Sequence, residues 1–103
     1  MYEDFFADRI SKLRLIKDVS AREMSLSIGQ NKNYINHIEN KKMFPSIQGF
    51  FYICEYLDIT PKEFFDEENT APTILNELIE ELKPLKKDAL EYLLGFVRET
   101  KKK

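Results

Sequence analysis

The sequence predicts an all-α fold, and three observations support that prediction. Apolar residues recur at the three- and four-residue spacing of amphipathic helices in successive short segments. S/T-x-x-E capping boxes at Ser20 and Thr60 mark two helix starts. Charged residues make up 33% of the chain, a fraction typical of a soluble, helix-rich protein. At 103 residues the chain is too short for two independent hydrophobic cores.

Three helices are expected in the first part of the chain, over residues 2–17, 20–28 and 31–39. The first helix carries an apolar face made by Phe6, Ile10 and Leu13. In the second helix, the side chains of Ser20 and Glu23 are each expected to accept a bond from the other residue's backbone amide. Gly29 supplies the left-handed conformation that ends this helix.

The third helix has two unlike sides. It buries Ile35 and Ile38 and turns polar, amide-rich side chains outward, those of Asn31, Lys32, Asn33, Asn36, His37 and Asn40. A helix of this kind, held to the preceding helix across a short turn, suits insertion into the major groove of DNA.

A fourth helix follows Pro45, with Ser46 as its N-cap. Its inward stripe is predicted to be Ile47, Phe50, Phe51, Cys54 and Leu57. The second capping box joins Thr60 and Glu63, with Pro61 at the favoured first position, and predicts a short fifth helix to about residue 66.

The acidic, polar residues 66–70 predict a boundary, which divides the chain into residues 1–68 and residues 69–103. After it, Pro72 opens a sixth helix, and Pro84 ends that helix and starts a seventh, so that the two form an αα-hairpin. A hairpin cannot bury so many leucines by itself, which predicts a homodimer. The expected dimer interface is Leu75, Leu78, Ile79, Leu82, Leu90, Leu93, Leu94 and Val97. The alternative, that the hairpin packs back on its own domain, stays open.

The net charge of −2 is unusual for a DNA-binding protein, but the charges are unevenly distributed. The segment from Arg9 to Lys42 holds eight basic and three acidic residues, whereas acidic residues gather at 66–68 and at Glu77, Glu80 and Glu81. The sequence therefore predicts a basic face on the first three helices.

Several classes of function are excluded by composition. No apolar run approaches a membrane span, and the acidic N-terminus is unlike a signal peptide, which predicts a cytoplasmic protein. The single cysteine, Cys54, is expected to be a small buried residue. One cysteine and one histidine provide no zinc site, and no catalytic cleft or phosphate-binding glycine loop is evident. We therefore expect no metal, no cofactor, no small-molecule ligand and no enzymatic activity.

An ordered set of residues resembles the lambda repressor/Cro-type (XRE-like) helix-turn-helix regulators from about residue 9 to residue 65. The set is Leu13-Arg14, Ser20, Met24-Ser25, Gly29, Ile35, Ile38-Glu39, Pro45, Ile47, Cys54, Leu57-Asp58-Ile59 and Phe64-Phe65. The resemblance implies a five-helix DNA-binding domain. The sequence departs from the pattern at Ala21, where relatives have a Gln that often touches phosphate, and at Lys41 and Asp58, where they have Gly. Asp58 tolerates left-handed geometry better than most residues.

The resemblance also implies roles for individual residues. The expected base contacts are Asn31, Lys32, Asn33, Asn36 and His37, and the expected phosphate contacts are Ser20, Arg22, Asn40, Lys41 and Lys42. Arg14 and Glu39 match an ion pair that orients the third helix. Leu26 falls where relatives keep a polar residue, and it either covers Phe5 or Phe6 or marks a partner surface.

Two functions follow from this interpretation. The first is a bacterial or phage transcriptional regulator, a repressor that binds a palindromic operator in double-stranded DNA as a homodimer. The second is a protein-interaction module of the antitoxin or anti-repressor type with weak DNA binding, which Ala21 and the acidic balance favour. The operator sequence, the target genes, the choice between repression and activation and the regulating signal stay open.

Overall fold

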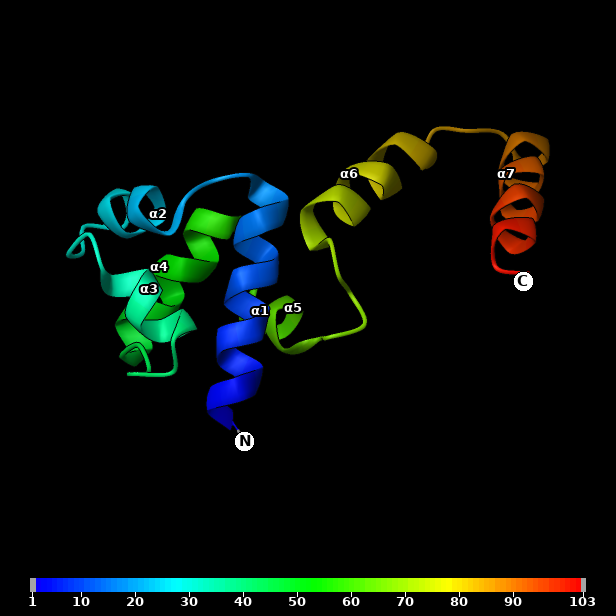
Figure 1. The fold of residues 1–103 in the computed structure, drawn as a ribbon. Coiled ribbons are helices and arrows are strands. Elements are labelled where there is room, and N and C mark those ends of the chain that lie inside the picture. Colours follow the sequence, from blue (N-terminus) through cyan, green and yellow to red (C-terminus); the bar gives the residue numbers. More distant parts are fainter. Residues whose placement is uncertain (1, 103) are drawn as a thin grey trace. The chain divides into compact units, whose positions relative to one another are not determined.

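A computed structural model describes residues 2–102, and every regular element in that range is a helix (Figure 1). The helices are α1 (Tyr2–Lys17), α2 (Ala21–Ser27), α3 (Tyr34–Glu39), α4 (Ile47–Leu57), α5 (Pro61–Phe65), α6 (Pro72–Leu82) and α7 (Lys87–Thr100). The all-α fold is therefore confirmed. Within residues 2–102, no helix combines the length and the apolar character needed to cross a membrane.

The chain divides into two compact units, residues 1–72 and residues 73–103. The first unit ends four residues later than the boundary expected after Glu68. The reason is that Pro72, the first residue of α6, is fully buried, so the polar segment before it belongs to the first unit.

The first unit has one apolar core, to which all five of its helices contribute. The most deeply buried side chains include Ile10, Met24, Ile35, Ile38, Ile53 and Phe64. The closely packed helix pairs are α2 with α3, α1 with α3, α1 with α4 and α4 with α5. Aromatic rings join α1, α4 and α5, because the Phe64 ring centroid lies 4.9 Å from that of Phe6 and 5.0 Å from that of Phe50.

The inward stripe of α4 differs from the prediction. Its buried residues are Gly49, Ile53, Cys54 and Leu57, whereas Ile47 is 76% exposed and Phe51 is 48% exposed. The helix is rotated because Gly49 meets α3: a Cβ atom at this position would lie 2.5 Å from the hydroxyl of Tyr34. Cys54 and Leu57 are buried as predicted and Phe50 packs against the core, so the prediction was wrong for Ile47 and Phe51, because a count of apolar residues ignores a glycine that permits close approach.

The predicted N-caps of the first unit are confirmed. The hydroxyl oxygens of Ser20, Ser46 and Thr60 accept the backbone amides of the residues three positions later, at 2.9, 3.0 and 3.1 Å. At Thr60 the return bond from the amide to the Glu63 carboxylate is also present, which completes that capping box. At Ser20 only the first of the two bonds of the predicted box is formed.

Four helices of the first unit end in the same way, with a left-handed residue followed by a pair of bonds back into the last turn. The left-handed residues are Asp18, Gly29, Lys41 and Asp58, with φ of 62°, 76°, 64° and 58°. After α3, for example, the Lys41 amide donates to the Ile38 carbonyl and the Lys42 amide donates to the His37 carbonyl. The expected left-handed conformations of Gly29 and Asp58 are thus confirmed, and the glycine of the family pattern at position 41 is explained.

The second unit consists of most of α6, all of α7 and the segment that joins them. Pro84 lies in this segment, and α7 begins at Lys87, three residues later than Pro84. The apolar side chains of both helices are largely exposed, from 37% for Leu90 to 56% for Ile74 among those expected to face a core, whereas Leu82 at the end of α6 is half-buried.

Candidate nucleic-acid interface

The candidate interface is built on α2, α3 and the turn between them. Gly29 and Gln30 close α2, because their amides donate to the carbonyls of Leu26 and Ser25 at 3.0 and 2.9 Å. The buried Ser25 hydroxyl then joins the two helices: it donates to the Ala21 carbonyl at 2.7 Å and accepts the Ile35 amide at 2.9 Å. The sequence indicated only that Ser25 is small, and its polar link to α3 was missed.

The start of α3 differs from the prediction. The helix begins at Tyr34, and Asn31, Lys32 and Asn33 lie in the turn before it. The cause is local: the Asn31 side-chain oxygen accepts the Asn33 amide at 2.9 Å, and the Asn31 carbonyl accepts the Tyr34 amide at 2.9 Å. An asparagine side chain that binds a nearby amide competes with helix formation.

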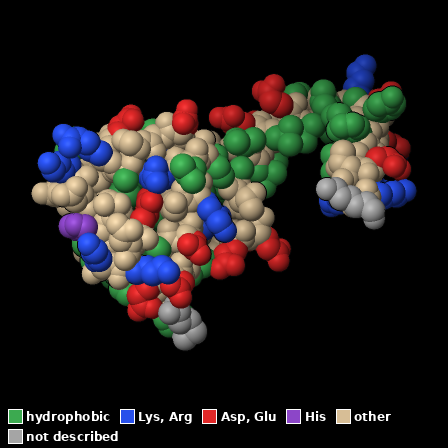
Figure 2. Space-filling view, viewed as in Figure 1, with side chains coloured by type: hydrophobic (Ala, Val, Ile, Leu, Met, Phe, Trp, Pro, Cys, Tyr) green, Lys and Arg blue, Asp and Glu red, His purple; other side chains and the backbone are tan. Residues whose placement is uncertain are grey.

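The five expected base-contact residues are all exposed, whereas Ile35 and Ile38 of the same segment are buried. We call Asn31, Lys32, Asn33, Asn36 and His37 the reading surface. Asn36 of this surface is linked to the neighbouring Asn40, since the Asn40 amide group donates to the Asn36 side-chain oxygen at 3.1 Å. Figure 2 shows basic side chains and the histidine at the α2–α3 end of the first unit.

The far end of α3 is fixed to α1 by Arg14. Its guanidinium donates two hydrogen bonds to the Glu39 carboxylate, at 2.7 and 3.0 Å, and a third to the Val19 carbonyl at 2.9 Å. The side chains of Arg14 and Glu39 are only 15% and 13% exposed. The bond to Glu39 raises the pKa of Arg14. The bidentate contact between Arg14 and Glu39 restrains both the position and the rotation of α3.

The expected phosphate-contact residues are also exposed, but they are not equally available. The Lys41 ammonium lies 2.6 Å from the Asp4 carboxylate of α1. This bond lowers the pKa of Asp4 and raises that of Lys41. Arg22, Lys32 and Lys42 form no ion pair with any residue in 2–102, so their charges can reach an external anion.

The predicted basic face is smaller than the sequence indicated, chiefly because Arg9 points inward. Its side chain is 5% exposed and donates to the carbonyls of Phe64, Glu63, Asp66 and Asn69, at 2.6 to 3.0 Å. Burial lowers the pKa of Arg9, whereas the four carbonyl dipoles stabilise the positive charge of its guanidinium. No sequence pattern predicts this role of Arg9, because the acceptors are backbone atoms more than 50 positions away.

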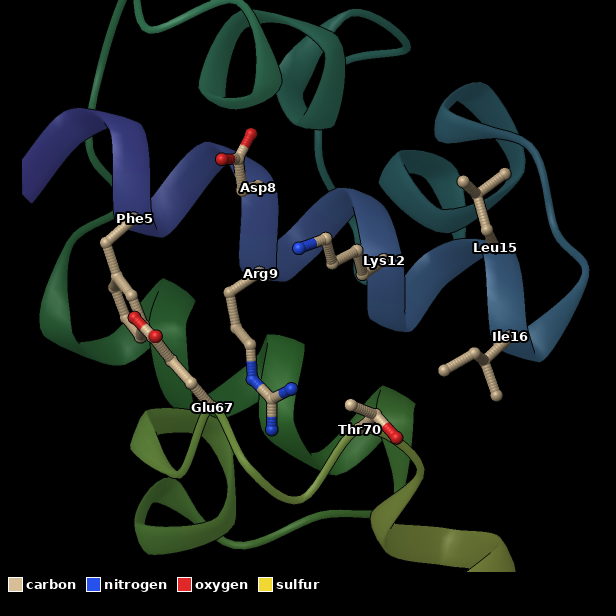
Figure 3. Close-up of a pocket in the computed structure, with 8 residues that line it drawn as sticks. All are labelled: Phe5, Asp8, Arg9, Lys12, Leu15, Ile16, Glu67 and Thr70. Carbon is tan, nitrogen blue, oxygen red and sulfur yellow. The ribbon is translucent and has the colours of Figure 1, made fainter. Parts of the chain in front are cut away.

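Arg9 lies beside a surface pocket of about 430 Å³ between α1 and the segment that follows α5 (Figure 3). The pocket is lined by Phe5, Asp8, Arg9, Lys12, Leu15, Ile16, Glu67 and Thr70. Two of these side chains are acidic, Asp8 and Glu67, and two are basic, Arg9 and Lys12.

Two further residues of the first unit, Cys54 and Leu26, differ in their burial. Cys54 is buried, as predicted, and burial raises the pKa of its thiol to about 11. Leu26 is 53% exposed on α2, so it does not join the core.

Comparison with known proteins identifies the fold. A family model described as a helix-turn-helix domain matches residues 7–70, more than half of the chain, including all of α2 to α5. Comparison with curated proteins and with solved structures gave no match. The matched residues contain the α2–α3 pair, the Arg14–Glu39 contact and the reading surface. The chain belongs to the helix-turn-helix domain family of the XRE/Cro type, and this membership implies DNA binding.

Proposed function

We propose that the protein is a sequence-specific transcriptional regulator that inserts its reading surface into the major groove. One observation carries the proposal: polar side chains stand exposed on α3 and its leading turn, over a backbone fixed by buried contacts. Ser25 fixes the start of α3 and Arg14 fixes its end. Amide side chains can pair with adenine, and a lysine can donate to guanine.

The contacts to the DNA backbone are assigned to exposed residues on either side of the reading surface. Ser20 and Arg22 lie at the start of α2, and Asn40 and Lys42 lie just after α3. Lys41 joins them only by leaving Asp4, so we expect it to contribute less than Lys42. Such contacts fix the register of the protein on DNA and carry no sequence information.

We further propose that the protein is a repressor without enzymatic activity that binds a palindromic operator as a homodimer. The exposed leucines of α6 and α7 provide the dimer contact in this proposal. A two-fold dimer presents two reading surfaces, and the operator half-sites would then lie about 34 Å apart, one turn of B-DNA.

A protein-interaction module with weak DNA binding is the second candidate, and the charges favour it. Of the eight basic residues between positions 9 and 42, Arg9 is buried, Arg14 is bound to Glu39 and Lys41 is bound to Asp4. Lys17 lies over the ring of Tyr56, at 4.9 Å from its centroid. Fewer cations that can reach phosphate mean weaker non-specific binding.

The test selects bound duplexes from random DNA and then measures the affinity of variants. Lys32→Ala with Asn33→Ala should lose on the order of 1–3 kcal/mol for each base contact removed and should relax specificity. Lys42→Ala should weaken selected and scrambled duplexes alike and reduce the salt slope by about 1. Lys62→Ala on α5 serves as the matched control and should change neither.

The outcomes separate the two candidates. If the double variant binds the selected duplex as tightly as the parent, the reading surface is wrong. If the parent itself binds selected and scrambled duplexes equally weakly, the protein-interaction module is the better description.

A further inference from the structure

Two neighbouring lysines follow α3, and their side chains have different surroundings. The Lys41 ammonium lies 2.6 Å from the carboxylate of Asp4, which belongs to the first turn of α1. Lys42 forms no ion pair with any residue in 2–102. The backbone of both lysines is fixed, since their amides donate to the carbonyls of Ile38 and His37, at 3.0 and 2.9 Å. Only the side chain of Lys41 therefore has to move for its ammonium to leave Asp4.

The ion pair between Lys41 and Asp4 is open to solvent. The side chain of Lys41 is 51% exposed and that of Asp4 is 60% exposed, so an external phosphate can approach the ammonium. An exposed pair of this kind changes an equilibrium by about fivefold at most. DNA can therefore break the bond, but at a measurable loss of affinity.

A second carboxylate of α1 acts on the same ammonium. Asp8 lies four residues after Asp4, and residues at this spacing share one face of a helix. The hydrogen bond from Lys41 to Asp4 and the charge of Asp4 raise the pKa of Lys41, and the charge of Asp8 adds to this effect. Lys41 thus faces an acidic edge of α1, on which Asp4 alone makes the direct contact.

Asp4 also has a simpler role, because an acidic residue in the first turn of a helix interacts favourably with the helix dipole. That role requires no contact with α3. The contact is specific to this chain, since Lys41 stands at a position where the family pattern has glycine. The dipole explains an acidic residue at the start of α1 but does not explain its bond to Lys41.

We infer that the Asp4 carboxylate competes with DNA phosphate for Lys41 and so lowers the affinity of the protein for DNA of any sequence. A bound protein either keeps the ion pair and lacks one phosphate contact, or gains that contact and loses the ion pair. Phosphate contacts carry no sequence information, so both choices weaken all duplexes alike. The inference rests on the proposed function, which assigns Lys41 to the DNA backbone, and names the residue that limits this contact.

Asp4→Asn tests the competition, because it removes the charge and keeps the size of the side chain. In the full chain, fluorescence anisotropy should show tighter binding of selected and scrambled duplexes alike, by about two- to fivefold. The slope of log K against log salt should also steepen by about 0.9, the value for one additional neutralised phosphate.

Two further variants separate competition from a general effect of charge on DNA binding. Asp8→Asn removes the same charge one turn away, where no ion pair is formed within residues 2–102, so its gain should be smaller and the salt slope should not change. Lys41→Gly removes the ammonium without strain, because φ at this position is 64° and glycine adopts such values readily. In the Lys41→Gly background, Asp4→Asn should have only the small effect of Asp8→Asn.

Three results would overturn the competition: equal gains from Asp4→Asn and Asp8→Asn, a gain from Asp4→Asn that persists in full with Lys41→Gly, or an Asp4→Asn affinity equal to that of the parent. Failure of the proposed function looks different. A parent that does not prefer the selected duplex is no sequence-specific regulator, yet its scrambled-DNA affinities still measure the competition for Lys41. A parent that binds neither duplex removes the proposed function and the competition together.

Discussion

Phe64 of the first unit and Phe96 of the second show how differently the two units use the same side chain. Phe64 is completely buried and touches the rings of Phe6 and Phe50, whereas Phe96 is 64% exposed on α7. Phe64 lies in the five-residue helix α5, and Phe96 lies in the 14-residue helix α7. The first unit therefore contains the partners of its apolar faces, whereas most apolar side chains of the second unit are exposed.

The two units also differ in how the ends of their helices are capped. The first unit caps α2, α4 and α5 with side-chain hydroxyls and ends four helices with left-handed residues. In the second unit, the N-cap residue of α7 is Lys86, which makes no side-chain cap bond. Short helices are marginal in water unless caps or packing stabilise them. We expect α7 to gain most of its stability from the contact that covers it.

The largest expected effect compares the two phenylalanines directly. Phe64→Ala should lower the free energy of unfolding by about 3–5 kcal/mol, because it leaves a cavity in the core. Phe96→Ala should change it by less than about 0.5 kcal/mol, since the side chain is exposed. Both values come from urea unfolding at a concentration at which the protein is monomeric. A comparable loss in Phe96→Ala would show that α7 is packed within the single chain.

A smaller effect concerns the end of the first unit. A chain of residues 1–72 should keep the stability of that unit, whereas a chain of residues 1–68 should lose about 2 kcal/mol, the value of a hydrogen bond to a charged group. The shorter chain lacks the Asn69 carbonyl that accepts from Arg9 and the buried Pro72.

Thermal unfolding of the two truncated chains provides the measurement. Arg9→Met in the longer chain is the control, because it keeps the apolar stem and removes the donors. Equal stability of the two truncations would place the boundary at residue 68, as the sequence alone suggested.

The features that the sequence predicted well depend on neighbouring residues. The N-caps at Ser20, Ser46 and Thr60 and the left-handed residues Gly29 and Asp58 follow from chemistry within one helical turn. Helix existence and capping could therefore be read from the sequence.

The features that could not be predicted from the sequence depend on residues that are distant in the chain. The Arg9 acceptors, the Lys41–Asp4 ion pair and the rotation of α4 around Gly49 arise only when α1, α3 and α5 are assembled. For the candidate site, the sequence indicated the exposed residues of the reading surface but overestimated the basic face. Charge counted along a chain does not show which cations point inward.

The smallest expected effect is that of a glycine-to-alanine substitution on stability, which should have opposite signs in the two units. Gly29→Ala should destabilise the first unit by about 1 kcal/mol, because alanine disfavours the left-handed conformation, and no atom lies within 4 Å of the added Cβ to clash with it. Gly95→Ala meets no atom within 4 Å either, but Gly95 lies inside α7, where alanine favours the helix by about 1 kcal/mol. Urea unfolding measures the first change, and hydrogen exchange of the α7 amides measures the second. If Gly95→Ala leaves that exchange unchanged, the stability of α7 is already set by a partner, and propensity within the single chain does not limit it.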